Sequence, residues 1–374
     1  MIKSSAIVFK ILKKLRMNKI VFFLLKPIIQ MNGKGKLNEY NGFDWREYLT
    51  AIHPDIGGSS LWEKKMTVLK EIDLDIIIPV YNVELYVEES IKSALNQQTK
   101  YKYRVIIVND GSTDGSLKIV NQFASCQNVL IFNQTNKGIS SARNVGLQHC
   151  QGKYVAFLDS DDRLTNDFVE VLMNEAYAND YDIVGGGFIR FKGDKYGPQI
   201  TRKTNKLFGY PWGKVYKSSL FERICFPDKY WFEDTVFDIV LHDLPKRVKN
   251  LDRVVVEHRA NPTGQTYSSK GNPMTIDTVW VTLKMLHDRE EINLPFDDKF
   301  AKKLLHQFWM NTIRIHSLRD KRADYVNFMA SVEIMRKYYP DERSIEYDDE
   351  KQRQITTAIY TNNFRLFMLA NMLL

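Results

Sequence analysis

Three aspartates follow directly after the apolar run Tyr154-Val155-Ala156-Phe157-Leu158, in the segment Asp159-Ser160-Asp161-Asp162. Carboxylates at the end of a buried strand are unfavourable unless a cation balances them. Hard oxygen ligands suit Mg²⁺ or Mn²⁺, and such sites leave the other coordination positions to waters and substrate phosphates. The segment therefore predicts a divalent metal that holds a phosphate. The alternative is a solvated turn in which Asp161 or Asp162 lies near a helix N-cap.

Strand and helix patterns alternate four times around this segment. The strand patterns cover 74–82, 103–108, 129–132 and 154–158, and the helical patterns cover 83–97, 116–124 and 139–149. This alternation predicts a parallel sheet with helices on both faces, in which ligands bind at the carboxyl ends of the strands. Pro79 to Asn82, Asp110, Asn136 to Gly138 and Asp159 to Asp162 all fall at that edge.

The motifs at these strand ends together resemble glycosyltransferase family 2. They are Ile78-Pro79-Val80-Tyr81-Asn82, Val108-Asn109-Asp110-Gly111-Ser112-Thr113-Asp114, Asn136-Lys137-Gly138 with Ser141-Ala142-Arg143-Asn144, and Phe157-Leu158-Asp159-Ser160-Asp161-Asp162. The resemblance covers about residues 73 to 270. It implies a GT-A fold and a nucleotide-diphosphate sugar as substrate.

The resemblance and its flanking segments define the expected organisation. The fold class is α/β: a GT-A domain, built on a Rossmann-like nucleotide-sugar-binding sheet, with a basic amphipathic N-terminal extension and a C-terminal helical region. We expect boundaries at 1–70, 71–270 and 271–374. The helical patterns of the last region lie at 275–288, 297–318, 324–338 and 352–374. With 374 residues, 44% of them apolar, the chain can bury an α/β core and a smaller helical unit.

The resemblance implies a UDP-sugar donor along the sheet edge. The residues that it places there are Pro79, Tyr81, Asn82, Asp110, Asn136, Gly138, Arg143, Asp159, Ser160 and Arg259. Asp110 would accept a hydrogen bond from the base, although closing an Asx turn over Gly111 is an alternative. Gly138 would permit close backbone approach, and Arg143 would supply charge near phosphate unless it lies on a solvated helix face.

The resemblance also implies a bound Mn²⁺ or Mg²⁺. The metal ligands that it implies are Asp161, Asp159 and His258. Asp159 would also face the ribose, and Asp162 would support the metal or the acceptor side. The segment 258–268 follows an expected strand at 253–257 and is placed like the family's flexible loop over the diphosphate. Arg259 would neutralise the leaving nucleotide there, and a structural role is the alternative for His258.

Two further motifs resemble the acceptor half of the family, Pro211-Trp212-Gly213-Lys214-Val215-Tyr216-Lys217 and Trp231-Phe232-Glu233-Asp234-Thr235-Val236-Phe237. The second contains a Glu-Asp pair from which inverting enzymes take their general base. Inversion in one displacement needs a carboxylate that accepts the proton of the acceptor hydroxyl. We assign this role to Asp234 and a positioning role to Glu233. The alternative is that the pair caps a helix at 235–244.

Basic residues are concentrated at the N-terminus. Residues 1–38 contain nine Lys or Arg and no acid, so the remainder of this chain of net charge +8 carries −1. Ile7, Ile11 and Leu15 share one helical face, which favours binding of residues 1–30 to an anionic membrane surface. A signal peptide and packing on the catalytic domain are the alternatives, but no small-residue cleavage site follows. Nucleic acid is not an expected partner, because no groove-reading motif is present.

Cysteine usage and hydropathy bear on the compartment. Three cysteines with no metal spacing favour reduced cytoplasm, and no apolar stretch reaches about 18 residues, so no transmembrane helix is predicted. The resemblance and basic N-terminus together predict an inverting, metal-dependent enzyme of the hexosyltransferase class. It would act at the cytoplasmic face of the cell membrane, as a peripheral protein, on a growing polyprenyl-linked glycan of a bacterial exopolysaccharide or capsule. The alternatives are transfer to a soluble or protein acceptor and an inactive nucleotide-sugar-binding scaffold.

Overall fold

The structure is a computed structural model that describes residues 18–31, 44–65, 67–202, 207–262, 264, 268–342 and 345–374. The chain forms two compact units. The α/β unit contains residues 56–264 and 283–294, and the helical unit contains residues 1–55, 265–282 and 295–374. Helix α10 (Asp277–Glu291) belongs in part to each unit. The described part of the N-terminal segment up to Asp55 thus groups with the C-terminal helices.

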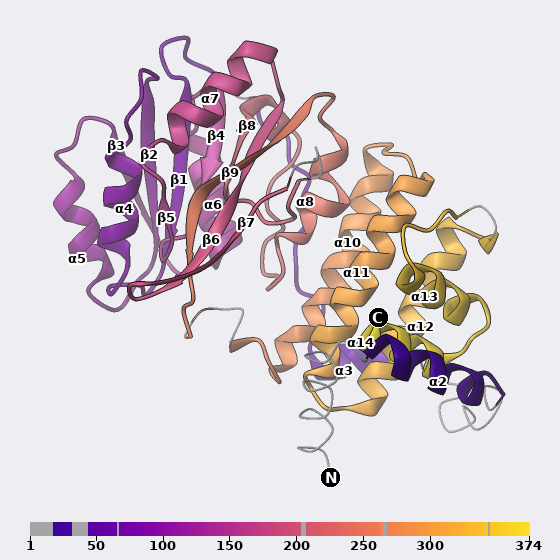
Figure 1. Ribbon diagram of the computed structural model, residues 1–374. Coiled ribbons are helices and arrows are strands. Elements are labelled where there is room, and N and C mark those ends of the chain that lie inside the picture. Colours follow the sequence, from indigo (N-terminus) through magenta and orange to yellow (C-terminus); the bar gives the residue numbers. More distant parts are fainter. Residues whose placement is uncertain are drawn as a thin grey trace. The chain divides into compact units, whose positions relative to one another are not determined.

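The α/β unit is built on one sheet, which has nine strands within the described residues (Figure 1). Its order is β3-β2-β1-β4-β8-β6-β9-β5, and β7 pairs with β6. The strands are β1 (Leu74–Val80), β2 (Tyr103–Asp110), β3 (Val129–Gln134), β4 (Tyr154–Phe157), β5 (Arg163–Leu164), β6 (Ile183–Lys192), β7 (Lys195–Ile200), β8 (Lys214–Lys217) and β9 (Val248–Arg259). Its helices are α4 (Val87–Leu95), α5 (Ser116–Val120), α6 (Ile139–His149), α7 (Phe168–Asn179) and α8 (Thr235–Ile239), with 3₁₀ turns η2 (Asn121–Phe123), η3 (Ser218–Phe221) and η4 (Leu241–Asp243).

Alternating side chains of the central strands bury both faces of the sheet. On one face Ile76 and Ile78 of β1 join a core that includes Ile91 of α4 and Phe168 of α7. On the other face α6 packs closely, and a Cβ added at Gly146 would lie 2.4 Å from a side-chain carbon of Ile77. A strand that is covered on both faces has a continuous run of apolar residues in the sequence. This explains why β1, β2, β3 and β4 could be predicted.

The predicted parallel sheet is confirmed for β3, β2, β1 and β4, which pair in parallel. The other half of the sheet is different, because β8 runs antiparallel to both β4 and β6. The strand expected at 253–257 extends from Val248 to Arg259, since its end pairs with β6. His258 and Arg259 therefore lie in a strand, and placing them in a loop was wrong. The helix expected at 235–244 is interrupted at Val240, which has φ −122° and ψ −65°.

The helical unit confirms the helical character expected beyond residue 270. Its helices are α2 (Asn18–Met31), α3 (Trp45–Ile52), α11 (Asp298–His316), α12 (Lys321–Tyr338), α13 (Glu350–Tyr360) and α14 (Phe364–Leu373), with the 3₁₀ turn η5 (Pro273–Ile276). Side chains of Asp297, Asp320, Asp349 and Asn363 accept backbone N–H bonds at the helix starts, as N-caps do. The single pattern at 352–374 is two helices, because Asn362 takes a left-handed φ of 52° between them.

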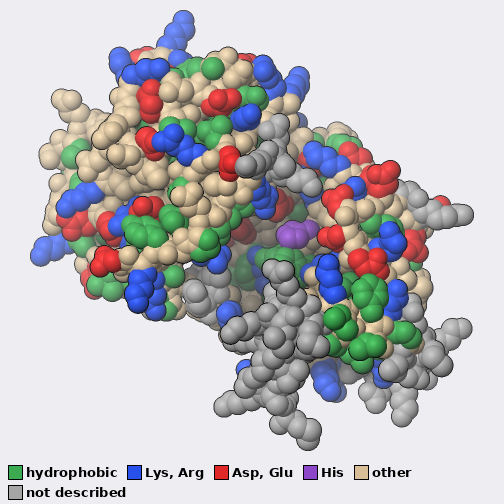
Figure 2. Space-filling view, in the orientation of Figure 1, with side chains coloured by type: hydrophobic (Ala, Val, Ile, Leu, Met, Phe, Trp, Pro, Cys, Tyr) green, Lys and Arg blue, Asp and Glu red, His purple; other side chains and the backbone are tan. Residues whose placement is uncertain are grey.

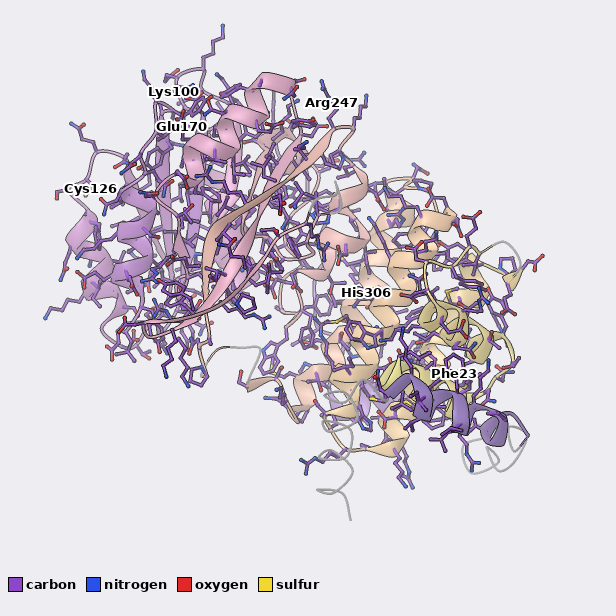
Figure 3. The ribbon with its side chains drawn as sticks, viewed as in Figure 1. Phe23, Lys100, Cys126, Glu170, Arg247 and His306 are labelled. Carbon is purple, nitrogen blue, oxygen red and sulfur yellow. The ribbon has the colours of Figure 1, made fainter. Side chains whose placement is uncertain are left out.

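Helix α2 lies beside α14, and Asn18 Nδ2 donates to Leu373 O at 2.6 Å (Figure 1). Phe22 is fully buried, whereas Ile20, Phe23 and Leu24 are 56%, 52% and 67% exposed. Figure 2 shows hydrophobic side chains gathered on the surface where Figure 1 places α2, and Figure 3 labels Phe23. The predicted amphipathic face of Ile7, Ile11 and Leu15 lies outside the described residues. No helix in the described part of the chain is long and apolar enough to cross a bilayer.

Candidate active site

The segment Asp159 to Asp162 forms a tight turn between β4 and β5. Asp162 N donates to Asp159 O at 3.0 Å, and the Asp162 side chain is fully buried. His258 Nδ1 lies 2.9 Å from Asp162 Oδ2, and Arg259 N donates to Oδ1 at 2.7 Å. Burial raises the pKa of Asp162 to about 6, although His258 opposes this shift. Asp162 thus ties the turn to the end of β9 and sets the orientation of the His258 ring.

Asp161 is the second aspartate of this turn, and a neighbouring asparagine contacts its carboxylate. Its Oδ2 accepts a hydrogen bond from Asn261 Nδ2 at 2.9 Å. Burial raises its pKa, and the nearby Asp159 raises it further. A raised pKa means that the folded protein disfavours the negative charge, so a cation bound there would be stabilised.

Arg259 supports the same turn from β9. Its Nε donates to Asp161 O at 2.7 Å, and its guanidinium pairs with Glu89 of α4. The guanidinium carbon lies 4.7 Å from the Tyr86 ring centroid and 4.4 Å from that of Phe191. With this many contacts, Arg259 holds the backbone of the turn in place in this structure.

Arg143 joins the turn to the predicted acceptor motif. Its side chain is 2% exposed, and it pairs with Asp159 Oδ1 at 2.7 Å and with Glu233 Oε1 at 2.5 Å. The alternative of a solvated Arg143 is wrong, because α6 directs this residue into the protein. Arg143 Nε is buried and has no hydrogen-bond partner. One buried cation therefore links a donor-side carboxylate to the Glu233-Asp234 pair.

Glu233 and Asp234 stand at the start of α8 but in different surroundings. Glu233 is 7% exposed, and burial raises its pKa to about 7 against the opposing charge of Arg143. Asp234 is half-buried and occupies the N-cap position, where its side chain makes no capping hydrogen bond. The structure therefore does not support a side-chain capping role for Asp234. Asp234 is thus more exposed than Glu233.

The predicted base-binding residues lie at the ends of β1 and β2. Asp110 is 2% exposed, and its side chain accepts hydrogen bonds from Gln134 Nε2 at 2.6 Å, Lys137 N at 2.8 Å and Gly138 N at 2.8 Å. These three bonds leave at most one of about four acceptor positions for a ligand. Gly138 has φ 91°, and nothing lies within 4 Å of an added Cβ, so its backbone is open to close approach.

The other residues predicted to bind the sugar donor lie in the loops after the strands and within β1. Pro79 is within β1, and Tyr81 is 45% exposed beyond its end. Asn82 has φ 49°, and its Oδ1 accepts a bond from Thr113 N at 2.8 Å, which joins the loops after β1 and β2. Asn136 Oδ1 accepts from Gly138 N at 3.2 Å. Ser160, 8% exposed, lies within the aspartate turn.

The donor set at this edge fits a hard divalent cation, since Asp159 and Asp161 offer carboxylate oxygens. Across the described residues, no three His, Cys, Asp or Glu side chains are grouped so that they could hold a metal. Asp161, Asp159 and His258 are therefore not brought together as a complete protein-made site. Sites of one or two carboxylates, completed by substrate phosphates, are common for Mg²⁺.

Two supporting residues, Glu89 and Asn261, were not predicted from the sequence. Glu89 pairs with both Arg163 and Arg259 from α4, and Asn261 contacts Asp161. Asn261 fell within a segment predicted to be functional, so its polarity next to Arg259 could have indicated it. Glu89 could not be found this way, because its role depends on the pairing of β5 with β9.

Arg143→Met should lower the free energy of unfolding by about 3–5 kcal/mol, because Asp159 and Glu233 both lose the buried cation that pairs with them. Chemical denaturation at pH 7 measures this change. Adding Glu233→Gln should recover part of the loss, since it removes one of the two unpaired charges. A double variant no more stable than Arg143→Met would contradict the importance of this ion pair.

The predicted GT-A fold of the α/β unit is confirmed by a family profile and by similarity to solved structures. The profile of Glycosyl transferase family 2 matches residues 75–229. The resemblance to glycosyltransferase family 2 is therefore confirmed for residues 75–229. In fold the chain is similar to S. aureus TarS residues 1–349, solved with UDP-GlcNAc, with a TM-score of 0.61, 18% identity, and 80% of this chain and 90% of that chain covered.

Two relatives share clear sequence similarity with the same domain. The chain is 33% identical to the uncharacterized glycosyltransferase EpsJ of Bacillus subtilis over 216 residues, which are 52% of this chain and 62% of EpsJ. It is 31% identical to the glycosyltransferase GlyA of Streptococcus pneumoniae over 217 residues, which are 51% of this chain and 31% of GlyA. The chain thus spans less than two thirds of either relative.

Proposed function

We propose that this chain transfers a sugar from a UDP-sugar to a hydroxyl of a growing bacterial glycan, with inversion at the anomeric carbon and with a divalent metal. The observation that carries the proposal is the link through Arg143 between Asp159 on the donor side and the Glu233-Asp234 pair. Donor-binding and acceptor-activating carboxylates thus share one site. The names of the relatives and of TarS support the reaction class, and the choice of UDP rests on the motif resemblance.

Donor binding is assigned to the carboxyl ends of β1, β2 and β4. The remaining acceptor position of Asp110 would receive a base N–H, and the open backbone at Gly138 would approach the nucleotide. Asp161 and Asp159 would hold Mn²⁺ or Mg²⁺ with His258 alongside, and the ion when bound would neutralise the diphosphate leaving group. Without such a cation, the acidic turn would repel a diphosphate.

Acceptor activation is assigned to Asp234, which would take the proton of the attacking hydroxyl. Glu233 would act as a positioning residue. Its ion pair with Arg143 anchors the first residue of the pair, so the backbone that carries Asp234 is held against α6. Asp234 is then the member of the pair that we assign to proton transfer.

Incubation of the protein with individual UDP-sugars, Mn²⁺ and candidate acceptors tests the proposal by measuring UDP release. We expect release that depends on one sugar and stops in excess chelator. NMR of the product should show an inverted anomeric configuration. UDP binding without release on any acceptor would favour a scaffold, and a retained configuration would exclude single displacement.

For the acceptor, we propose a polyprenyl-linked glycan at the cytoplasmic face of the membrane. The supporting observations are the nine basic residues of segment 1–38 and the exposed apolar side chains of α2, of which Ile20, Phe23 and Leu24 share one helical face. Basic residues near an anionic surface each contribute about 1 kcal/mol. Insertion of apolar side chains adds a contribution that salt does not screen.

Phe23→Asp with Leu24→Asp should weaken binding to anionic vesicles by more than about 10-fold, since each fully buried side chain of this type contributes about 1.5–3 kcal/mol. Vesicle flotation measures the change, and thermal stability should stay the same because both side chains are exposed. Ile313→Asp is the matched control, an exposed apolar residue of α11 at 42% exposure, and it should not alter binding. Unchanged vesicle binding in the double variant would contradict the assignment of α2.

A further inference from the structure

Four aromatic rings lie face to face in a row that ends at His258, and we call Phe208, Tyr210, Trp212 and His258 the ring stack. The centroids of Phe208 and Tyr210 are 5.1 Å apart at 14°, and those of Tyr210 and Trp212 are 3.7 Å apart at 13°. Trp212 and His258 are 5.1 Å apart at 17°. Phe188 of β6 meets all four rings edge-on. The His258 ring thus packs against a buried aromatic core through Trp212 and Phe188.

Buried side chains of β8 hold the backbone that carries the ring stack. Lys214 is fully buried, and its Nζ donates to Tyr210 O at 2.7 Å and to Trp212 O at 3.3 Å. Tyr216 Oη donates to Pro211 O at 3.0 Å. Gly213 permits the turn with φ 72°. Three successive carbonyls are therefore fixed, and the Trp212 ring has little freedom to tilt.

His258 is held by two different constraints. The contact of Nδ1 with Asp162 at 2.9 Å fixes the direction of one ring nitrogen but leaves the ring free to tilt about that contact. The face of Trp212, which is 7% exposed, removes this tilt. The His258 side chain is 34% exposed, so part of it is accessible to a ligand. Together the two contacts set where Nε2 points.

We infer that Trp212 is a positioning residue that fixes the plane of the His258 imidazole, so that Nε2 is presented to the metal–diphosphate group of the donor. The inference rests on the proposed function. It assigns the Pro211-Trp212-Gly213-Lys214 motif to the donor site, which the motif supports, whereas the resemblance assigned it to the acceptor half. Lys214 then supports His258 indirectly, because it holds the carbonyls of Tyr210 and Trp212.

Calorimetric binding of UDP to the full chain, in Mn²⁺ and in excess chelator, tests the inference. Trp212→Leu should weaken binding by about 10-fold or more in Mn²⁺, as loss of a residue supporting a metal ligand does, and should leave binding in chelator unchanged. Trp212→Phe should restore most of the affinity, because a flat ring again covers His258. Phe168→Leu is the control for general packing loss, since Phe168 is fully buried in the same core but outside the ring stack. It should not change the effect of Mn²⁺.

A double-mutant cycle separates positioning from loss of structure. In a His258→Ala background, Trp212→Leu should have no further effect on Mn²⁺-dependent UDP binding. Equal effects of Trp212→Leu in both backgrounds, or no effect when His258 is present, would overturn the inference while leaving the proposed function intact. If His258→Ala alone changes nothing, both the inference and the assignment of His258 fail. Failure of the unmodified chain to bind UDP would instead refute the proposed donor.

Discussion

Asp161→Ala should lower the rate of sugar transfer by about 10³-fold or more and remove the dependence of UDP binding on Mn²⁺, because a bound metal contributes several kcal/mol of charge stabilisation. The fold should survive. Burial and the neighbouring Asp159 raise the pKa of Asp161, so its charge is unfavourable in the folded state. We therefore expect a melting temperature equal to or slightly above that of the unchanged protein. Transfer assays and calorimetry measure the two losses, and circular dichroism follows the melting temperature.

Asp194→Ala is the matched control for this variant, since Asp194 is an exposed aspartate at the turn between β6 and β7. It should leave transfer and Mn²⁺ dependence unchanged. Asp162→Ala gives a useful contrast, because it removes the contacts to His258 and to Arg259 N and should lower stability. Full activity of Asp161→Ala, or of the unchanged protein in excess chelator, would end the metal-dependent interpretation.

Asp234→Asn should reduce kcat by about 10²-fold or more and leave the affinity for UDP nearly unchanged, because it removes the proton acceptor and keeps the shape of the side chain. Its side chain makes no capping hydrogen bond, so loss of the helix start is not an expected explanation for lower activity. Steady-state kinetics with calorimetric UDP binding separates the two quantities.

Asp238→Asn applies the same chemical change one turn further along α8 and should alter kcat only slightly. Equal losses of kcat and UDP affinity in Asp234→Asn would assign Asp234 to the nucleotide site instead. A loss of the same size in Asp238→Asn would show that the helix, rather than one carboxylate, is responsible.

The sequence was sufficient to predict the half of the sheet that contains β1 to β4. Each of these strands has a run of apolar side chains on both faces and ends in a polar motif, so local pattern and tertiary position coincide. It was not sufficient for β6 and β8. Gly185, Gly186 and Gly187 weaken the pattern of β6, and β8 is only four residues long, so pairing with distant strands decides their structure.

The same distinction applies to the site. Carboxylates at strand ends were visible as motifs, because their order along the chain reflects their order at the sheet edge. The ion pair of Arg143 with Glu233 was not visible, since the two residues are 90 positions apart and meet only in the folded chain. The role of Trp212 beside His258 was likewise hidden, because one ring precedes β8 and the other belongs to β9. These contacts depend on tertiary structure that no local pattern encodes.

The ion pair between Arg143 and Glu233 limits how this chain can be recombined with its relatives. A chimera that exchanges the segment after β8 to change acceptor preference would also exchange a counter-charge of a buried arginine in α6. If the incoming segment lacks a carboxylate at the position of Glu233, the buried arginine keeps Asp159 but loses one of its two counter-charges. A segment exchanged between relatives therefore has to include both Arg143 and Glu233. Chimeras with a junction between α6 and α8 should first be checked for this arginine–carboxylate pair.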